Sequence, residues 1–291
     1  MSQPQEKYVE VNGTRLCYFE RGTPSKERPT LLFVHATGFH ARTWDYHCEA
    51  LAEFHSIAID QRGHGRSSKL AVDNWRTFGE DQQAFIEALD LRNLFGVGHS
   101  MGGHGLVQAA AGSSRRFAGL LLLDPTISEP DAYRAEAADA ESGLHPAAKR
   151  RKFFASVDAM VESLGSKSSF PLFAPRIFND YCKYGLEPAP DGRQLQLCCE
   201  PEIEAHVYMA ARSNKGIYDS VRSLDRPVMI IRAQRPADMT VMDFSVSPTW
   251  PGLVREFNNA QELHWQDCTH FIPMQRPNEV VQAIRDNTAA V

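Results

Sequence analysis

The 291-residue chain is predicted to fold as an α/β protein with a mostly parallel sheet covered by helices on both faces. The first observation behind this prediction is that short apolar runs, typical of strands, alternate with stretches of helical periodicity. The second is that one such run, residues 94–98, turns directly into a helix-compatible stretch over residues 101–111. Strands that alternate with helices form parallel sheets buried between helical layers.

The individual elements follow from local patterns. Asn12-Gly13 is a strong two-residue turn signal between residues 8–11 and 15–19, so these two segments are predicted to form an opening β-hairpin. The other predicted strands cover residues 30–34, 56–60, 94–98, 119–123, 228–232 and 261–265. The predicted helices cover residues 44–54, 78–89, 101–111 and 278–285. We expect ligands beyond the carboxyl ends of these strands, as in other parallel sheets.

Residues 129–222 break the alternation and are called the inserted segment below. They combine helix-like stretches with a stretch punctuated by prolines, and they are too apolar for a disordered linker. Their aromatic side chains, which need a surface to pack on, include Phe153, Phe154, Phe170, Phe173 and Phe178. The chain is therefore predicted to consist of a core, residues 1–128 and 223–291, and a mainly helical cap, residues 129–222.

Composition excludes several classes of function. The chain is 43% hydrophobic and 23% charged, with a net charge of −5 and no basic stripe, so nucleic acid is not an expected partner. The polar N-terminus carries no secretory signal pattern, and no apolar run is long enough to span a bilayer. Six dispersed cysteines without C-x-x-C spacing argue against a zinc site or a disulfide framework. These features predict a cytoplasmic protein, and they leave a homodimer open.

The sequence Gly-His-Ser-Met-Gly at residues 98–102 carries most of the chemical information. It matches G-x-S-x-G, and it has a predicted strand before it and a predicted helix after it. A strand that turns sharply into a helix lifts the corner residue, here Ser100, clear of the sheet. The first turn of that helix offers unpaired N–H groups to a developing negative charge.

With three further motifs, the chain resembles the α/β-hydrolase superfamily, in particular its esterase- and lipase-like serine hydrolases with a helical cap. His-Ala-Thr-Gly-Phe at residues 35–39 is similar to the family's H-G-x motif, and residues 60–67 are similar to its D-x-R-G-x-G-x-S turn. Thr-His-Phe at residues 269–271 is similar to its histidine loop. The resemblance covers residues 30–124 and 224–285, and it implies an eight-stranded sheet with the cap inserted after strand 6.

The resemblance implies a catalytic triad in the order Ser, acid, His, with Ser100 as the nucleophile. A serine hydroxyl needs a base to remove its proton. His264 falls within a predicted strand, whereas His270 lies in the loop after that strand and is the predicted base. The chain departs from the family in having Thr269, where glycine often precedes this histidine.

Three aspartates are candidates for the acid that orients the base. Asp124 ends a run of leucines directly after strand 6, a position from which some family members supply the acid. Asp238 and Asp243 lie in the loop after strand 7, the more usual source, but that loop lacks the compact Gly-x-x-Asp signature. Asp124 is the favoured assignment, with Asp238 as the alternative and Asp243 after it.

The resemblance also assigns the oxyanion hole to the backbone N–H groups of Thr37 and Met101. Two such donors stabilise a tetrahedral intermediate, and one is typically worth about 3 kcal/mol. Ala36 replaces the usual glycine, which predicts that the backbone there does not need a positive φ.

Other polar residues in these motifs receive structural roles. His35 is expected to hold its loop, and Asp60 and Arg62 to brace a turn. His99 and His104, on either side of the nucleophile, are assigned no chemistry.

The favoured function is a serine hydrolase that cleaves an ester, thioester or lactone through an acyl-enzyme. The aromatic residues of the inserted segment predict a small apolar substrate enclosed under a cap. No metal or organic cofactor is implied. Carbon–carbon bond hydrolysis, acyl transfer and cofactor-free perhydrolysis can use the same three residues and remain alternatives, as does a ligand receptor with slow catalysis.

Overall fold

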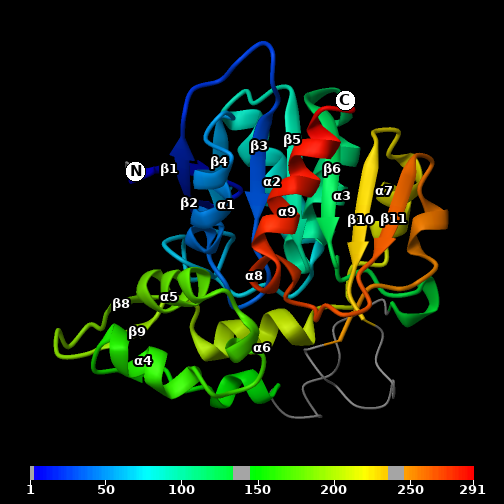
Figure 1. Ribbon diagram of the computed structural model, residues 1–291. Helices are drawn as coiled ribbons and strands as arrows, with labels where there is room; N and C mark the ends of the chain where they lie inside the picture. Colours follow the sequence, from blue (N-terminus) through cyan, green and yellow to red (C-terminus); the bar gives the residue numbers. More distant parts are fainter. Residues whose placement is uncertain (1–2, 134–144, 235–245) are drawn as a thin grey trace.

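The computed structural model describes residues 3–133, 145–234 and 246–291. Its centre is an eight-stranded sheet in the order β1-β2-β4-β3-β5-β6-β10-β11, in which only the β1–β2 and β2–β4 pairings are antiparallel (Figure 1). The strands are β1 (Gln5–Val11), β2 (Thr14–Arg21), β3 (Thr30–Val34), β4 (Ser56–Ile59), β5 (Leu94–His99), β6 (Phe117–Leu123), β10 (Val228–Arg232) and β11 (Ala260–His264). The predicted fold class, a mostly parallel eight-stranded sheet, is confirmed.

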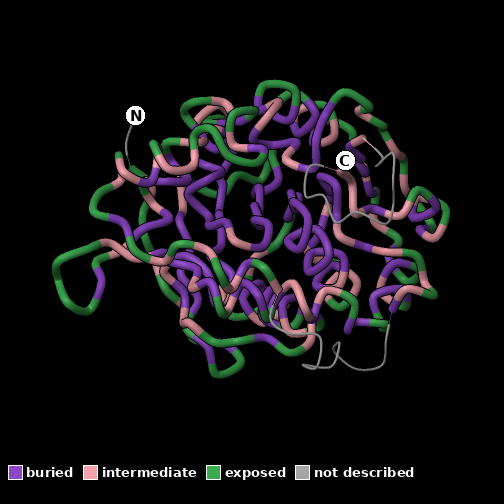
Figure 2. Tube along the Cα trace, turned by 90° about the horizontal axis from the view of Figure 1, so that it is seen from below, coloured by how far each residue is buried: buried purple, intermediate pink, exposed green. Residues whose placement is uncertain are grey.

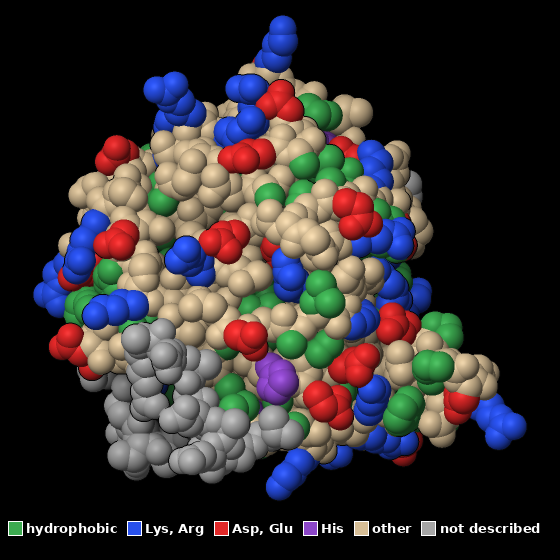
Figure 3. All heavy atoms as spheres, turned by 180° about the vertical axis from the view of Figure 1, so that it is seen from behind, with side chains coloured by type: hydrophobic (Ala, Val, Ile, Leu, Met, Phe, Trp, Pro, Cys, Tyr) green, Lys and Arg blue, Asp and Glu red, His purple; other side chains and the backbone are tan. Residues whose placement is uncertain are grey.

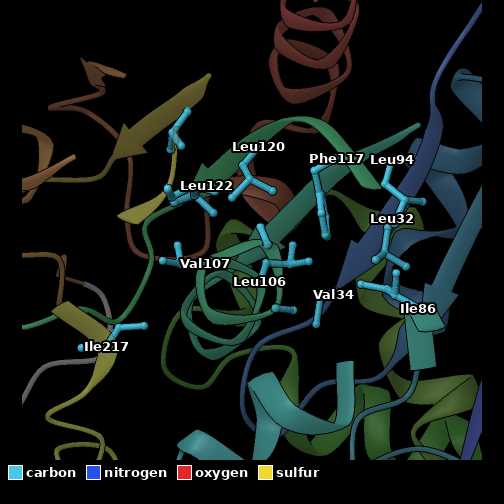
Figure 4. Packing of buried hydrophobic residues seen from close by; sticks show 14 of the residues in the cluster. Leu32, Val34, Ile86, Leu94, Leu106, Val107, Phe117, Leu120, Leu122 and Ile217 are labelled. Atoms are coloured by element: carbon cyan, nitrogen blue, oxygen red, sulfur yellow. The ribbon is translucent and has the colours of Figure 1, made fainter. Parts of the chain in front are cut away.

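Helices cover both faces of this sheet. One face is covered by α2 (Arg76–Ala88), α3 (Met101–Gly112) and α7 (Ile217–Ser223). The other is covered by α1 (Asp45–Ala50), α8 (Ile272–Gln275) and α9 (Pro277–Thr288). In the first layer, Leu106 and Val107 of α3 pack against the apolar side chains of β3, β5 and β6 (Figure 4). The near-continuous apolar character of the central strands follows, because a strand buried on both faces needs apolar residues on both.

Two local predictions have different outcomes. The opening hairpin forms as expected, with Asn12 at φ 46° and Gly13 at φ 67°, the left-handed conformations that a two-residue turn of this kind requires. The predicted helix over residues 44–54 is wrong in its extent, because the structure has a 3₁₀ turn followed by α1, which ends at Ala50. The chain must reverse between Ala50 and Ser56 to enter β4, and this reversal ends the helix early.

Apart from α7, the described part of the inserted segment lies beyond the carboxyl ends of the parallel strands, below the sheet in Figure 1. It contains α4 (Val157–Leu164), α5 (Pro175–Tyr184), α6 (Pro201–Met209) and a small sheet of β7 (Phe153–Phe154), β9 (Leu195–Leu197) and β8 (Leu186–Pro188). Its last helix, α7, packs on α3 of the core. The 3₁₀ turns in the described residues are Ala41–Trp44, Ser114–Arg116, Pro130–Ala132, Pro146–Lys149, Phe170–Leu172 and Leu253–Glu256.

Aromatic side chains join the inserted segment to the sheet loops. Phe173 lies 6.2 Å from Phe39 and 5.2 Å from Phe271, measured between ring centroids. Phe39 and Phe271 are themselves 5.9 Å apart, and Tyr181 of α5 lies 5.0 Å from Phe39. Viewed from the side of this segment, buried residues form the interior and exposed turns the periphery (Figure 2). The sequence predicted that the aromatic residues of the inserted segment need a surface to pack on. For Phe173, this surface includes Phe39 and Phe271 of the sheet loops.

The cysteines and the surface charges are distributed as in an ordinary globular protein. The six cysteines are all buried free thiols. Acidic and basic side chains are interspersed on the face seen from behind (Figure 3). Among the described residues, no helix combines the length and apolarity needed to cross a bilayer.

Buried histidines are expected to make the folded protein less stable at acidic pH. Burial lowers the pKa of His40 to about 3 and that of His64 to about 4. A histidine whose pKa is lower in the folded state than in the unfolded state stabilises the fold fully at a pH above its unfolded pKa of about 6.5. This stabilisation is lost as the pH falls toward the folded pKa, because the unfolded state then binds the proton. For His40 alone, the loss between about pH 7.5 and about pH 5 is about 2 kcal/mol.

The His40→Gln variant should flatten this dependence. Nε2–H of His40 donates to the Tyr181 carbonyl oxygen over 3.1 Å, and a glutamine amide can replace this donor without titrating. Urea unfolding at about pH 7.5 and about pH 5 should show a smaller drop in the free energy of unfolding for the variant than for the wild type. Equal drops in both proteins would contradict the assignment of acid lability to His40.

Candidate active site

Ser100 occupies a strained corner between β5 and α3. Its backbone adopts φ 55° and ψ −118°, and its N–H donates to the Leu123 carbonyl oxygen of β6 over 3.1 Å. A Cβ at position 98 would lie 2.7 Å from Gly103 Cα, and one at position 102 would lie 2.3 Å from the Val34 carbonyl oxygen. Only glycine fits at these two positions. The glycines of the motif thus allow the sharp turn that carries the serine.

Ser100, His270 and Asp124 form a continuous hydrogen-bond chain. His270 Nε2 lies 2.9 Å from Ser100 Oγ, and His270 Nδ1 lies 2.6 Å from Asp124 Oδ2. Asp124 lies in the loop that follows β6, and His270 lies in the loop that follows β11. Ser100 is 6% exposed, His270 8% and Asp124 0%, so the chain is largely shielded from water. The other predicted acids, Asp238 and Asp243, lie outside the described residues.

Asp124 is held by three further donors. Its Oδ1 accepts from the Ala233 backbone N–H over 3.0 Å and from Ser247 Oγ over 2.6 Å. The Thr249 hydroxyl lies 3.1 Å from Oδ1 and shares its single proton with the Pro125 carbonyl oxygen, 2.7 Å away. These bonds compensate for burying a carboxylate and leave Oδ2 facing the imidazole. The sequence motifs did not predict the roles of Ser247 and Thr249. The available signal was a pair of hydroxyl residues two positions apart in the loop expected to face the catalytic edge.

The loop that carries His270 is fixed from two sides. Gln275 Oε1 accepts from the Thr269 N–H and hydroxyl over 2.9 and 2.8 Å. Thr269, the departure from the family pattern, therefore anchors the loop through its side chain. On the other side, His99 Nε2–H donates to the His270 carbonyl oxygen over 2.9 Å. Burial and the nearby His270 ring hold the pKa of His99 well below its ordinary value, so this donor ring is neutral.

The predicted oxyanion donors lie beside the serine. Thr37 Oγ1 donates to Met101 Sδ over 3.3 Å, which places the two residues next to each other. In the described part of the chain, neither backbone N–H has a protein acceptor. Ala36 has no positive φ, as predicted, and Gly38 instead takes the left-handed conformation at φ 76°. These contacts are compatible with the predicted role of the two amides as oxyanion donors.

The bracing residues hold the neighbouring loops. His35 Nδ1–H donates to its neighbour's carbonyl over 2.7 Å, and its Nε2 accepts from the Gln61 N–H over 3.0 Å. Asp60 accepts from the backbone of Ala41 and of Arg66, each over 2.7 Å, and burial raises its pKa. Arg62 pairs with an aspartate of α2 over 2.7 Å. Within the described ranges, no three His, Cys, Asp or Glu side chains are grouped as metal ligands.

Comparison with known proteins places this chain in a family. Residues 31–283 match the model of the alpha/beta hydrolase family, so the chain belongs to that family, as its motifs predicted. It is 24% identical to monoacylglycerol lipase ABHD6 of Bos taurus over 305 residues, 99% of this chain and 83% of that protein.

Two further similarities concern only part of the chain or only its fold. The chain is 29% identical to the dihydrolipoyllysine-residue acetyltransferase component of the acetoin cleaving system of Cupriavidus necator over 121 residues. This match spans 41% of the chain and only 32% of that relative. The crystal structure of E-2-(acetamidomethylene)succinate hydrolase superposes with a TM-score of 0.72 at 20% identity, covering 99% of this chain and all of that one. At this identity the likeness shows the fold.

Proposed function

We propose that the protein is a serine hydrolase that cleaves an ester, thioester or lactone of a small apolar substrate through an acyl-enzyme. The observation that carries the proposal is the hydrogen-bond chain from Ser100 Oγ through His270 to Asp124. A serine, a base and an acid in this sequence of contacts form the arrangement that activates a hydroxyl for attack on a carbonyl.

In the proposed acylation, Ser100 Oγ attacks the substrate carbonyl carbon while its proton passes to His270 Nε2. The imidazolium is stabilised by the Asp124 carboxylate at Nδ1, over the 2.6 Å hydrogen bond. The carbonyl oxygen becomes an oxyanion and accepts from the N–H groups of Thr37 and Met101. Collapse of the intermediate breaks the bond to the leaving group, which takes the proton from His270 as it departs.

In the proposed deacylation, the same residues act on water. His270 Nε2 takes a proton from water as its oxygen attacks the acyl carbon, and the second tetrahedral intermediate occupies the same two backbone donors. Its collapse breaks the bond to Ser100 Oγ, which recovers the proton from His270 and releases the acid. The 2.9 Å contact between His270 Nε2 and Ser100 Oγ supports the proton transfers in both steps.

The aromatic cluster supports an apolar acyl group. The Phe271 ring lies 5.6 Å from the His270 ring, measured between centroids, and Phe39, two residues after Thr37, lies 5.9 Å from Phe271. Phe173 of the inserted segment packs on both, at 6.2 and 5.2 Å between centroids. The monoacylglycerol lipase similarity, over nearly the full chain, also supports ester cleavage.

Covalent labelling combined with substrate profiling tests this proposal. Wild-type protein should react with a fluorophosphonate probe and hydrolyse p-nitrophenyl esters, with a preference among chain lengths. Lactones and vinylogous diketones in the same panel would reveal ring opening and carbon–carbon cleavage. Absence of labelling and of turnover with every substrate would contradict the proposal and favour a receptor.

A further inference from the structure

A second hydroxyl touches the proposed nucleophile. Thr126, two residues after Asp124, places Oγ1 3.0 Å from Ser100 Oγ. This residue belongs to none of the sequence motifs, and neither the triad nor the oxyanion hole uses it. Its side chain has no other hydrogen-bond partner in the part of the chain that the structure describes. The hydroxyl is therefore directed at the reacting oxygen alone.

The backbone of Thr126 is fixed around this contact. Its N–H donates to the Ser100 carbonyl oxygen over 3.1 Å, and its carbonyl oxygen accepts from His104 Nδ1–H over 3.0 Å. His104 is in turn held at Nε2 by the Asn214 side-chain amide over 3.0 Å. Burial lowers the pKa of His104 to about 4, so the ring stays neutral near pH 7 with its Nδ1 proton toward Thr126.

The direction of the bond follows from the protons available. In the resting state of the proposed triad, His270 Nδ1–H donates to the Asp124 carboxylate. His270 Nε2 is then an acceptor, and the single Ser100 proton is donated to it. Ser100 Oγ has no proton left for Thr126. The Thr126 hydroxyl must therefore donate to Ser100 Oγ.

We propose that Thr126 is a further catalytic residue, whose hydroxyl donates to Ser100 Oγ and holds this oxygen in line with His270. Within the proposed function on which this inference rests, the bond fixes the serine rotamer. It also stabilises the negative charge that develops on Oγ as the proton leaves. This bond is strongest when Oγ is most negative, so its contribution appears in acylation.

The test compares Thr126→Val with Thr126→Ser. Valine keeps the shape of threonine and removes the donor, whereas serine keeps the donor and removes a methyl group. Thr126→Val should lower kcat/KM by about tenfold and slow phosphonylation by the fluorophosphonate probe by a similar factor. Thr126→Ser should recover most of both rates. Thr77→Val, on the partly buried face of α2, is the matched control for the substitution itself.

The phosphonylation rate separates a role at Oγ from a structural one. Thr126 is only partly buried and its loss orphans no buried group, so the melting temperature of both variants should stay near that of the wild type. Equal phosphonylation rates in the valine variant and the wild type would overturn the inference, as would a serine variant no better than the valine one. The proposed function fails on a different result, the persistence of turnover in Ser100→Ala.

Discussion

Ser100→Ala should abolish turnover while leaving the fold intact. Alanine removes the oxygen that contacts both His270 Nε2, at 2.9 Å, and the Thr126 hydroxyl, at 3.0 Å. The remaining site can still bind substrate and polarise its carbonyl, but it has no nucleophile. Losses on the order of a million-fold in kcat follow when the nucleophile of such a unit is removed.

The fold should tolerate this change, because the Ser100 side chain makes no packing contact that alanine would lose apart from its oxygen. The glycines at 98 and 102, which allow the strained turn, are untouched. Hydrolysis of a p-nitrophenyl ester measures the loss, and circular dichroism with thermal melting checks the fold. Residual kcat above a few per cent of the wild-type value, in protein freed of contaminating esterase, would remove Ser100 from its role.

Asp124→Asn should lower kcat by about 10⁴. The carboxylate accepts from His270 Nδ1 over 2.6 Å, which keeps the imidazole proton away from Nε2. An asparagine amide can present its NH₂ group to Nδ1 instead, which favours the tautomer that cannot accept the serine proton. The neutral side chain also gives no charge to stabilise the imidazolium. Both effects act on the chemical step, so KM should change much less than kcat.

The matched control is Asp238→Asn, in the loop after β10. We expect a much smaller effect on kcat from this variant, because Asp124 already occupies the position beside Nδ1. Measuring kcat and KM for both variants with the same ester decides between the two aspartates. A nearly silent Asp124→Asn, or a larger loss in Asp238→Asn, would assign the acid to the strand-7 loop.

Local sequence patterns predicted the strands of the sheet and the turn that carries Ser100. The elbow is encoded within residues 94–111, because the strand end, the tight corner and the helix start are contiguous in the chain. The Asn12-Gly13 turn is equally local. The sequence placed His270 in the loop after a strand, from its position relative to the last apolar run. The end of α1 was missed because a reversal toward β4, and not helix propensity, terminates it.

Tertiary structure decided which side chains meet. Asp124 and His270 are 146 residues apart in the chain, and the three donors that hold Asp124 arrive from beyond β10. The resemblance to the family predicted the Asp124–His270 pair, but nothing in the sequence predicted these three donors, because their contacts arise from the parallel arrangement of β6, β10 and β11.

The same reason applies to Thr126 and to the aromatic cluster. Two hydroxyls 26 positions apart lie within 3.0 Å because β5 and β6 are neighbours in the sheet and both loops leave at the same edge. Phe173 meets Phe39 and Phe271 only because the inserted segment folds across that edge. The sequence by itself determined the elements and the chemical type of the residues at their ends. Packing of the strands side by side determined the order, distances and hydrogen-bond directions of the site.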